Sequence, residues 1–194
     1  MLTVYIDFKS AAAYLAVKST LDLAKDLDLA IDWRPFRTVE RDVPKLGQEE
    51  TVGESHRRVR AASQRALAIK YAAHQGIDLR FPEKLGVTDL ALGVLTDISG
   101  DKLLYVRAAF DAYWADHADL DDASVIQNLI EQSGAQYDGD LGKPRDRLVR
   151  AQDEAEEAGI VGAPAYVIDE QIFVGREHLP WIEEIARAMA SDAV

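Results

Sequence analysis

A serine stands where a strand-like run meets a helical pattern near the start of the chain. Residues 5–16 read YIDFKSAAAYLA, and Ser10 lies where the apolar run ends. The turn between a strand and a helix is a point at which many α/β proteins hold their reactive atom, and the Ser10 hydroxyl is such a candidate. Serine is also a preferred N-cap residue, which serves only to close the start of a helix. Ser10 is therefore a candidate catalytic group or a helix cap, and the two roles can coexist.

Cysteine and histidine offer no second chemical centre. The chain has no cysteine, which excludes disulfides, thiolate metal sites and a redox cycle run by the protein's own thiols. Metal sites on helices use paired spacings such as His-x-x-x-His. The four histidines lack such a spacing and lie far apart, at His56, His74, His117 and His178. We therefore expect no metal site and no dithiol–disulfide oxidoreductase.

The composition is that of an acidic globular protein. The 194 residues are 48% hydrophobic and 29% charged, which suits one large domain or one domain with an insertion. The net charge of −12 argues against nucleic-acid binding, because such binding depends on neutralising phosphates. No apolar run approaches the roughly 20 residues that span a bilayer, and the N-terminus shows no signal-peptide pattern. We expect a cytoplasmic protein without a membrane or nucleic-acid partner.

Hydrophobic patterning predicts strands at the two ends of the chain. The first end forms a strand–helix–strand unit with parallel strands, covering 2–8, 10–28 and 29–36. At the other end, the segments APAYVID and QIFVG form a hairpin around Asp169–Glu170. The last helix starts near Leu179 with Pro180 in its first turn. Its apolar positions should be buried, and they are Ile182, Ile185, Ala186 and Met189.

The middle of the chain is predicted to be helical. An irregular connection over 38–54 precedes helical patterns that glycine and proline separate. These patterns cover 55–75, 88–98, 101–118, 122–133 and 144–158. The simplest arrangement joins the two ends of the chain in one sheet. Residues 1–37 and 144–194 then form one domain, and 38–143 form an all-helical insertion.

Five segments together resemble a known family. They read YIDFKSAAAYLA, WRPF, YAAHQGIDLRFP, AYW and GIVGAPAYVIDEQIFVGREHL. They are similar to the DsbA-like thioredoxin superfamily, and within it to the branch of 2-hydroxychromene-2-carboxylate isomerases and kappa-class glutathione transferases. The resemblance implies an α/β fold of thioredoxin type, βαβ…αββα with the helical insertion. It also implies glutathione as a thiol cofactor or co-substrate, and it allows a homodimer.

The resemblance assigns roles to three segments. Ser10 resembles a hydrogen-bond donor to the thiolate of bound glutathione, so that the ligand supplies the sulfur that the chain lacks. The segment Gly162-Ala163-Pro164, here called the GAP segment, implies a cis Ala163–Pro164 bond beside Ser10. The Ala163 backbone would then pair with the cysteinyl part of glutathione. Before the last helix, the resemblance gives Arg176, Glu177 and His178 to the γ-glutamyl end. A solvated, charged helix start is the alternative for these three residues.

Two segments depart from the family pattern. Relatives commonly have Ser-Pro followed by aromatic residues where this chain has alanines at 11–13, and Gly-Ser/Asn-Asp-Arg where it has Gly-Arg-Glu-His at 175–178. The preferred function is a glutathione-dependent isomerase, or a kappa-type transferase, acting on an aromatic conjugated substrate. The alternative is a redox-inactive scaffold without cysteine that serves as a binding module.

One basic run interrupts the acidic background: Arg57, Arg58, Arg60 and Arg65 on a predicted helix. A solvated face with salt bridges is one interpretation. The other is a positive rim that attracts glutathione or an aromatic carboxylate. Trp33, Tyr113 and Trp114 are interpreted as core or interface aromatics.

Overall fold

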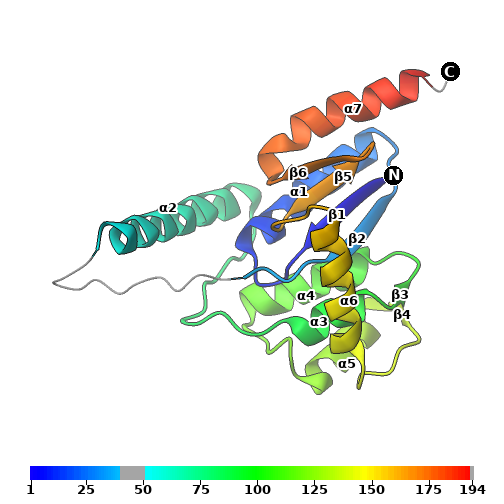
Figure 1. Cartoon of the computed structure of the whole chain (residues 1–194). Helices are drawn as coiled ribbons and strands as arrows, with labels where there is room; N and C mark the ends of the chain where they lie inside the picture. The colour runs from blue at the N-terminus through cyan, green and yellow to red at the C-terminus, as the bar shows by residue number, and fades with distance from the viewer. Residues whose placement is uncertain (40–50, 193–194) are drawn as a thin grey trace.

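A four-stranded sheet brings the two ends of the chain together. The computed structural model describes residues 1–39 and 51–192. The strands are β1 (Leu2–Ile6), β2 (Ile31–Pro35), β5 (Ala165–Ile168) and β6 (Gln171–Val174), in the order β2-β1-β5-β6. β1 pairs with β2 in parallel and with β5 antiparallel, and β5 and β6 form an antiparallel hairpin. The predicted α/β class and the predicted strand pairings are confirmed (Figure 1).

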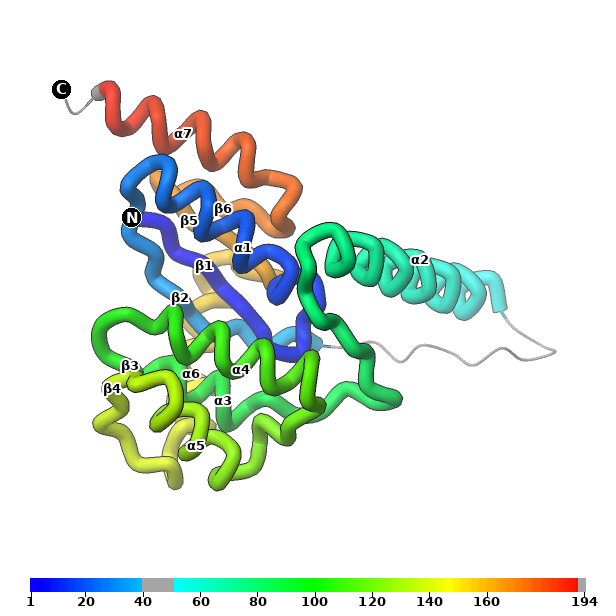
Figure 2. Tube along the Cα trace, turned by 180° about the vertical axis from the view of Figure 1, so that it is seen from behind, coloured from blue at the N-terminus to red at the C-terminus, as the bar shows by residue number. Residues whose placement is uncertain are grey.

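Helix α1 (Ala11–Asp26) connects the two parallel strands and lies against β1 (Figure 2). Its buried face includes Tyr14, Leu15 and Val17, at the spacing expected of one side of a helix. Leu2, Val4 and Ile6 of β1 alternate toward the same core. The strand therefore ends at a fixed point, from which the chain turns directly into the first turn of α1.

The C-terminal segment completes the sheet and covers it. Asp169 and Glu170, between β5 and β6, have φ values of 49° and 60°, as a two-residue hairpin turn requires. A short 3₁₀ turn, η1 (Arg176–His178), then leads into α7 (Leu179–Asp192). Ile182 and Ala186 are buried as predicted, whereas Met189 is 42% exposed. The prediction for Met189 was wrong because α7 extends past the sheet at its C-terminal end (Figure 1).

The middle of the chain is helical, as predicted. The helices are α2 (Val52–Gln75), α3 (Asp89–Leu95), α4 (Leu103–Ala115), α5 (Ala123–Ser133) and α6 (Pro144–Glu157). The predicted helix over 88–98 ends early, and Ile98–Ser99 (β3) pairs with Gln136–Tyr137 (β4) instead. Strands of two residues are too short for a period to be detected. Of the predicted irregular connection, 40–50 lie outside the described residues, and 52–54 already belong to α2.

One large apolar core joins the sheet to the helical block. It contains Val4 and Tyr166 of the sheet together with Leu92 of α3, Phe110 of α4 and Ile182 of α7. The division into 1–37 with 144–194 and 38–143 stays a prediction about domain boundaries. Helix α2 differs from the other helices: it projects from the body in Figure 1, and among its residues only Ala72 is buried.

Candidate functional site

Ser10 caps α1 and also contacts the segment before β5. Its hydroxyl oxygen accepts a hydrogen bond from the Ala13 N–H at 3.2 Å, and the hydroxyl donates to the Ala163 carbonyl oxygen at 3.0 Å. The Ala163–Pro164 peptide bond is cis. The capping interpretation of Ser10 is therefore confirmed. Two segments 153 residues apart in the sequence meet at this one hydroxyl.

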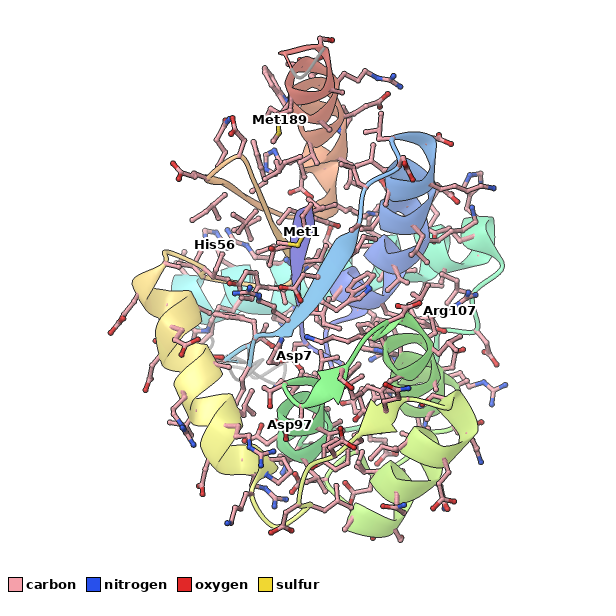
Figure 3. All side chains as sticks on the ribbon, turned by 90° about the vertical axis from the view of Figure 1, so that its right-hand side faces the viewer. Met1, Asp7, His56, Asp97, Arg107 and Met189 are labelled. Atoms are coloured by element: carbon pink, nitrogen blue, oxygen red, sulfur yellow. The ribbon has the colours of Figure 1, made fainter. Side chains whose placement is uncertain are left out.

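Asp7 holds the turn that presents Ser10. Its side chain is fully buried, and Figure 3 shows it where the end of β1 meets the helical block. The carboxylate accepts hydrogen bonds from the Lys9 N–H, from the N–H and hydroxyl of Thr38, and from the Thr88 hydroxyl, at 2.6–3.2 Å. A buried carboxylate with four donors is well satisfied. Asp7 thus fixes the loop between β1 and α1 to the connections before α2 and α3.

Ser10 opens onto a cavity of about 570 Å³, here called the Ser10 pocket. Its apolar wall consists of Leu15, Leu67, Phe81, Leu85 and Trp114, together with alanines at 11, 12, 61 and 68. The Phe81 and Trp114 rings meet edge to face, with centroids 5.3 Å apart. A flat, conjugated molecule suits such a wall, because aromatic rings contribute large contact areas.

The connection after α2 brings Phe81 to this pocket. The Arg80 N–H donates to the Trp114 carbonyl oxygen at 2.9 Å, and the Gly86 N–H donates to the Tyr113 hydroxyl at 2.9 Å. Both bonds attach the connection to the end of α4. Trp114 is itself buried, as predicted, and its indole N–H donates to the Phe8 carbonyl oxygen at 2.9 Å. A core tryptophan therefore also forms part of the pocket wall.

Charged side chains gather at the rim of the Ser10 pocket. Lys9, Arg65, Arg176 and Glu177 line it. The Arg176 guanidinium carbon lies 3.8 Å from the centroid of the Tyr71 ring, and Arg176 also donates to the Leu15 carbonyl oxygen at 3.4 Å. Three cations against one carboxylate give the rim a positive potential in an otherwise acidic protein.

A second cavity of about 790 Å³, here called the His74 cavity, lies on the other side of the Arg176–Tyr71 contact. Lys18, Ser19, His74, Gln75 and Leu179 line it. It shares Leu67, Tyr71, Arg176 and Glu177 with the Ser10 pocket. A ligand longer than one pocket can therefore extend from Ser10 past the 175–177 turn.

The structure brings five of the six predicted site residues together. Ser10, Arg176 and Glu177 line the Ser10 pocket, and Ala163 contacts Ser10. The Pro164 carbonyl oxygen accepts a hydrogen bond from the Gly175 N–H at 2.9 Å, which joins the GAP segment to the turn before α7.

His178 is not brought to the pocket. Its ring lies against Phe173, with centroids 5.8 Å apart, and it lines neither the Ser10 pocket nor the His74 cavity. The reason is the 3₁₀ turn over Arg176–His178, which turns successive side chains by about 120°. The side chain of Arg176 therefore faces the pocket while that of His178 faces β6.

Sequence reasoning missed the walls that α2 and its following loop contribute. Tyr71 and Phe81 lie in the segment YAAHQGIDLRFP, which carries part of the family resemblance, but no site role was assigned to them, and Leu85 lies outside all five segments. Arg65 was noted only as part of a basic run. Lys9 had an available signal, because it directly precedes Ser10 in the sequence.

The family comparison agrees with this geometry. The model of the DSBA-like thioredoxin domain matches residues 1–186. The chain belongs to the DSBA-like thioredoxin domain family. The predicted relationship to DsbA-like proteins is thereby confirmed.

Individual relatives of this family extend the comparison. A 2-hydroxychromene-2-carboxylate isomerase from Sphingobium xenophagum is 28% identical over 190 residues, which are 92% of this chain and 94% of the relative. A solved structure of a 2-hydroxychromene-2-carboxylate isomerase superposes with a TM-score of 0.72 at 20% identity, over 99% of this chain and 97% of that one. The cytosolic disulfide reductase DsbM from Pseudomonas aeruginosa, solved with GSH, gives a TM-score of 0.57 at 12% identity, over 99% and 98% of the two chains.

Within residues 1–39 and 51–192, no group of three or more His, Cys, Asp or Glu side chains could hold a metal ion. In the same part of the chain, no helix has the length and apolar character to cross a membrane.

Proposed function

We propose that this protein is a glutathione-dependent isomerase that acts on an aromatic, conjugated carboxylate of the 2-hydroxychromene-2-carboxylate type. One observation carries the proposal: the Ser10 hydroxyl, at the N-terminus of α1 and bonded to Ala163, opens onto a pocket with an aromatic wall. The names of the isomerase relatives support the reaction type.

The residues around Ser10 fit a peptide thiol. Ala11 and Ala12 form the first turn of α1 and line the pocket, and the first N–H groups of a helix have no partner within it. A thiolate at this point meets these N–H groups, the hydroxyl and the positive end of the helix dipole, all of which favour the charged form. The GSH in the DsbM structure shows that a protein of this fold accommodates the ligand.

The two cavities suit the two parts of such a complex. Glutathione would extend from Ser10 along the 175–177 turn, where Arg176 and Glu177 offer one charge of each sign to its charged termini. The aromatic substrate would occupy the end of the Ser10 pocket formed by Phe81, Leu85 and Trp114. Both reactants are then held at one place, which lowers the entropic part of the barrier.

When bound, glutathione would supply a thiolate that adds reversibly to a conjugated carbon, so that the substrate can rotate about the former double bond. The chain stabilises the negative charge through Ser10 and the N-terminus of α1. In the ligand-free protein the Ser10 hydroxyl donates to the Ala163 carbonyl oxygen. Because a hydroxyl has one proton to donate, Ser10 must exchange this acceptor for sulfur when a thiolate binds.

Calorimetric titration with reduced glutathione tests the cofactor, and conversion of 2-hydroxychromene-2-carboxylate with and without glutathione tests the reaction. Saturable binding together with glutathione-dependent conversion is the expected result. Stable conjugates with an electrophilic aryl halide, without isomerisation, would assign the transferase activity instead. If the protein neither binds millimolar glutathione nor converts the substrate, the alternative is a binding scaffold without cysteine. One observation favours this alternative: His178, which the resemblance assigns to glutathione, lies against Phe173 and not in the pocket.

We further propose that the protein works in the cytoplasm. Glutathione and thioredoxin keep thiols reduced in that compartment, which a reaction dependent on a free thiol requires.

A further inference from the structure

Arg65 occupies a particular place in the Ser10 pocket. It lies on α2, and its guanidinium carbon is 4.5 Å from the centroid of the Phe81 ring. Phe81 in turn contacts Trp114. The cation therefore lies over the face of Phe81, one of the rings of the aromatic wall against which a flat substrate would lie.

The charge of Arg65 has no carboxylate partner in the described part of the chain, residues 1–39 and 51–192. Several other arginines are paired, such as Arg34 with Asp32, Arg80 with Asp78 and Arg187 with Glu183, each within 3.0 Å. An arginine that contacts only a ring keeps the donors of its planar fork available for a ligand. In a chain with 34 acidic and 22 basic residues, such an arginine at a pocket stands out.

The other two cations of the pocket are engaged with the protein. Lys9 Nζ lies 3.9 Å from the Asp7 carboxylate. Arg176 stacks on Tyr71 and donates to the Leu15 carbonyl oxygen, and the proposed function assigns its remaining donors to glutathione. Arg65 thus differs from both in what remains free to bind.

We infer that Arg65 determines the specificity of the pocket for a carboxylate on an aromatic ligand: its guanidinium binds the carboxylate while the ring packs on Phe81 and Trp114. A guanidinium binds a carboxylate through two parallel N–H···O bonds. The inference rests on the proposed function for the claim that this ligand is the substrate. The sequence left the basic run at 57–65 open between a solvated face and a positive rim, and Arg65 is the member of that run that lines the pocket.

The test compares cinnamate, an aromatic conjugated carboxylate, with its neutral amide, cinnamamide. Calorimetry should show that the unaltered protein binds cinnamate with an affinity about tenfold higher than its affinity for cinnamamide, or more. R65Q should remove this preference, and R65K, which keeps the charge without the fork, should keep a smaller one. R60Q is the matched control, because Arg60 lies exposed on the same helix and lines neither cavity. Thermal unfolding of all variants checks that the fold is unchanged.

Equal binding of the acid and the amide by the unaltered protein would overturn the inference, and so would a preference that survives R65Q but is lost in K9Q. A glutathione titration of the same proteins separates this outcome from the proposed function. If glutathione fails to bind while the preference for cinnamate depends on Arg65, the proposed function fails and the carboxylate site stands. If glutathione binds and the preference for cinnamate is absent, the carboxylate site fails and the proposed function stands.

Discussion

Ser10 is a residue in which a structural and a chemical role meet on one oxygen atom. The Ser10 hydroxyl oxygen accepts a hydrogen bond from the Ala13 N–H, and the hydroxyl donates a hydrogen bond to the Ala163 carbonyl oxygen. The cap requires an acceptor, whereas thiolate stabilisation requires a donor. Substitutions can therefore separate the two roles, because an ionised aspartate is a good N-cap residue that accepts hydrogen bonds but donates none.

At the residue scale, we expect S10A to raise the pKa of bound glutathione's thiol and to slow thiolate-dependent turnover by roughly ten- to a hundredfold. Loss of the cap should also lower the free energy of unfolding by about 1 kcal/mol. S10D should recover that stability but not the activity, because its carboxylate accepts the Ala13 N–H and has no proton to donate to a thiolate. Thiolate absorbance against pH and urea unfolding measure the two effects. A thiol titration unchanged in S10A would show that Ser10 is a cap only.

At the scale of elements, the contact between α3 and α6 depends on a glycine. A Cβ atom on Gly93 would overlap the carbonyl oxygen of Pro144, which begins α6. The backbones of the two helices approach this closely because Gly93 has no side chain. The same contact holds the helical block against the sheet, since α3 and α6 both pack on β2.

We therefore expect G93A to lower the free energy of unfolding by about 1–3 kcal/mol, because backbone must move to relieve the overlap. The matched control is G53A in α2, where the nearest atom to a new Cβ, on the flexible side chain of Arg57, is 3.7 Å away. G53A should stabilise the protein by up to about 1 kcal/mol through helix propensity. Urea unfolding measures both variants, and equal effects would show that the α3–α6 contact can adjust.

At the scale of the whole molecule, three tyrosines join distant elements through buried hydroxyl groups. The Tyr14 hydroxyl donates to Asp111 at 2.7 Å, the Tyr105 hydroxyl donates to the Ala91 carbonyl oxygen at 3.0 Å, and Tyr166 bonds Thr20 at 3.0 Å. Burial raises the pKa of all three phenols, that of Tyr166 to about 12. The hydrogen bond to Asp111 raises the pKa of Tyr14 further.

These raised pKa values predict alkaline destabilisation. The unfolded chain releases the phenol protons near pH 10, the ordinary pKa of tyrosine, while the folded protein still holds them. The stabilisation is thus complete below about pH 10 and is lost as the pH rises above it. The urea midpoint should fall over this range, with phenolate absorbance appearing together with unfolding. Y14F, which removes one such proton, should show a shallower decline, and a midpoint that does not change with pH would contradict the prediction.

Helix α2 leads to an expectation about assembly. Val52, Val59 and Ile69 of α2 are about half or more exposed, and none of them lines the Ser10 pocket or the His74 cavity. The helix also carries five cationic residues and one acidic residue, in a chain of net charge −12. A helix surface with exposed apolar side chains and positive charge complements the acidic surface of a second copy of the chain.

We therefore expect a homodimer in which α2 of one copy contacts the body of the other. Sedimentation should show a dimer that weakens as the salt concentration rises and that V59D and I69D disrupt. V161D is the control, because Val161 is an exposed apolar residue outside α2. A monomer at high protein concentration and low salt would contradict this expectation.

The sequence by itself determined most of the elements and one end of the site, but not the short β3–β4 pair. The β-branched run before Ser10, the Asp169–Glu170 turn and the helical pattern at 122–133 are local signals, and β1, the hairpin turn and α5 stand where they were predicted. Ser10 and the GAP segment could be named together only because their motif resembles that of a family. Local patterns work here because a cap, a turn or a period involves residues within a few positions of one another.

Only the tertiary structure decided what faces Ser10. Tyr71, Phe81 and Trp114 come from α2, a connection and α4. They lie in segments that carry the family resemblance, but the sequence did not indicate that the three side chains form one wall. The same holds for His178, which a 3₁₀ turn directs toward Phe173, and for Met189, which extends past the sheet. A helical period shows which residues share a face but not which element covers that face. The covering element is set by packing between segments far apart in the chain, and that packing made the pocket.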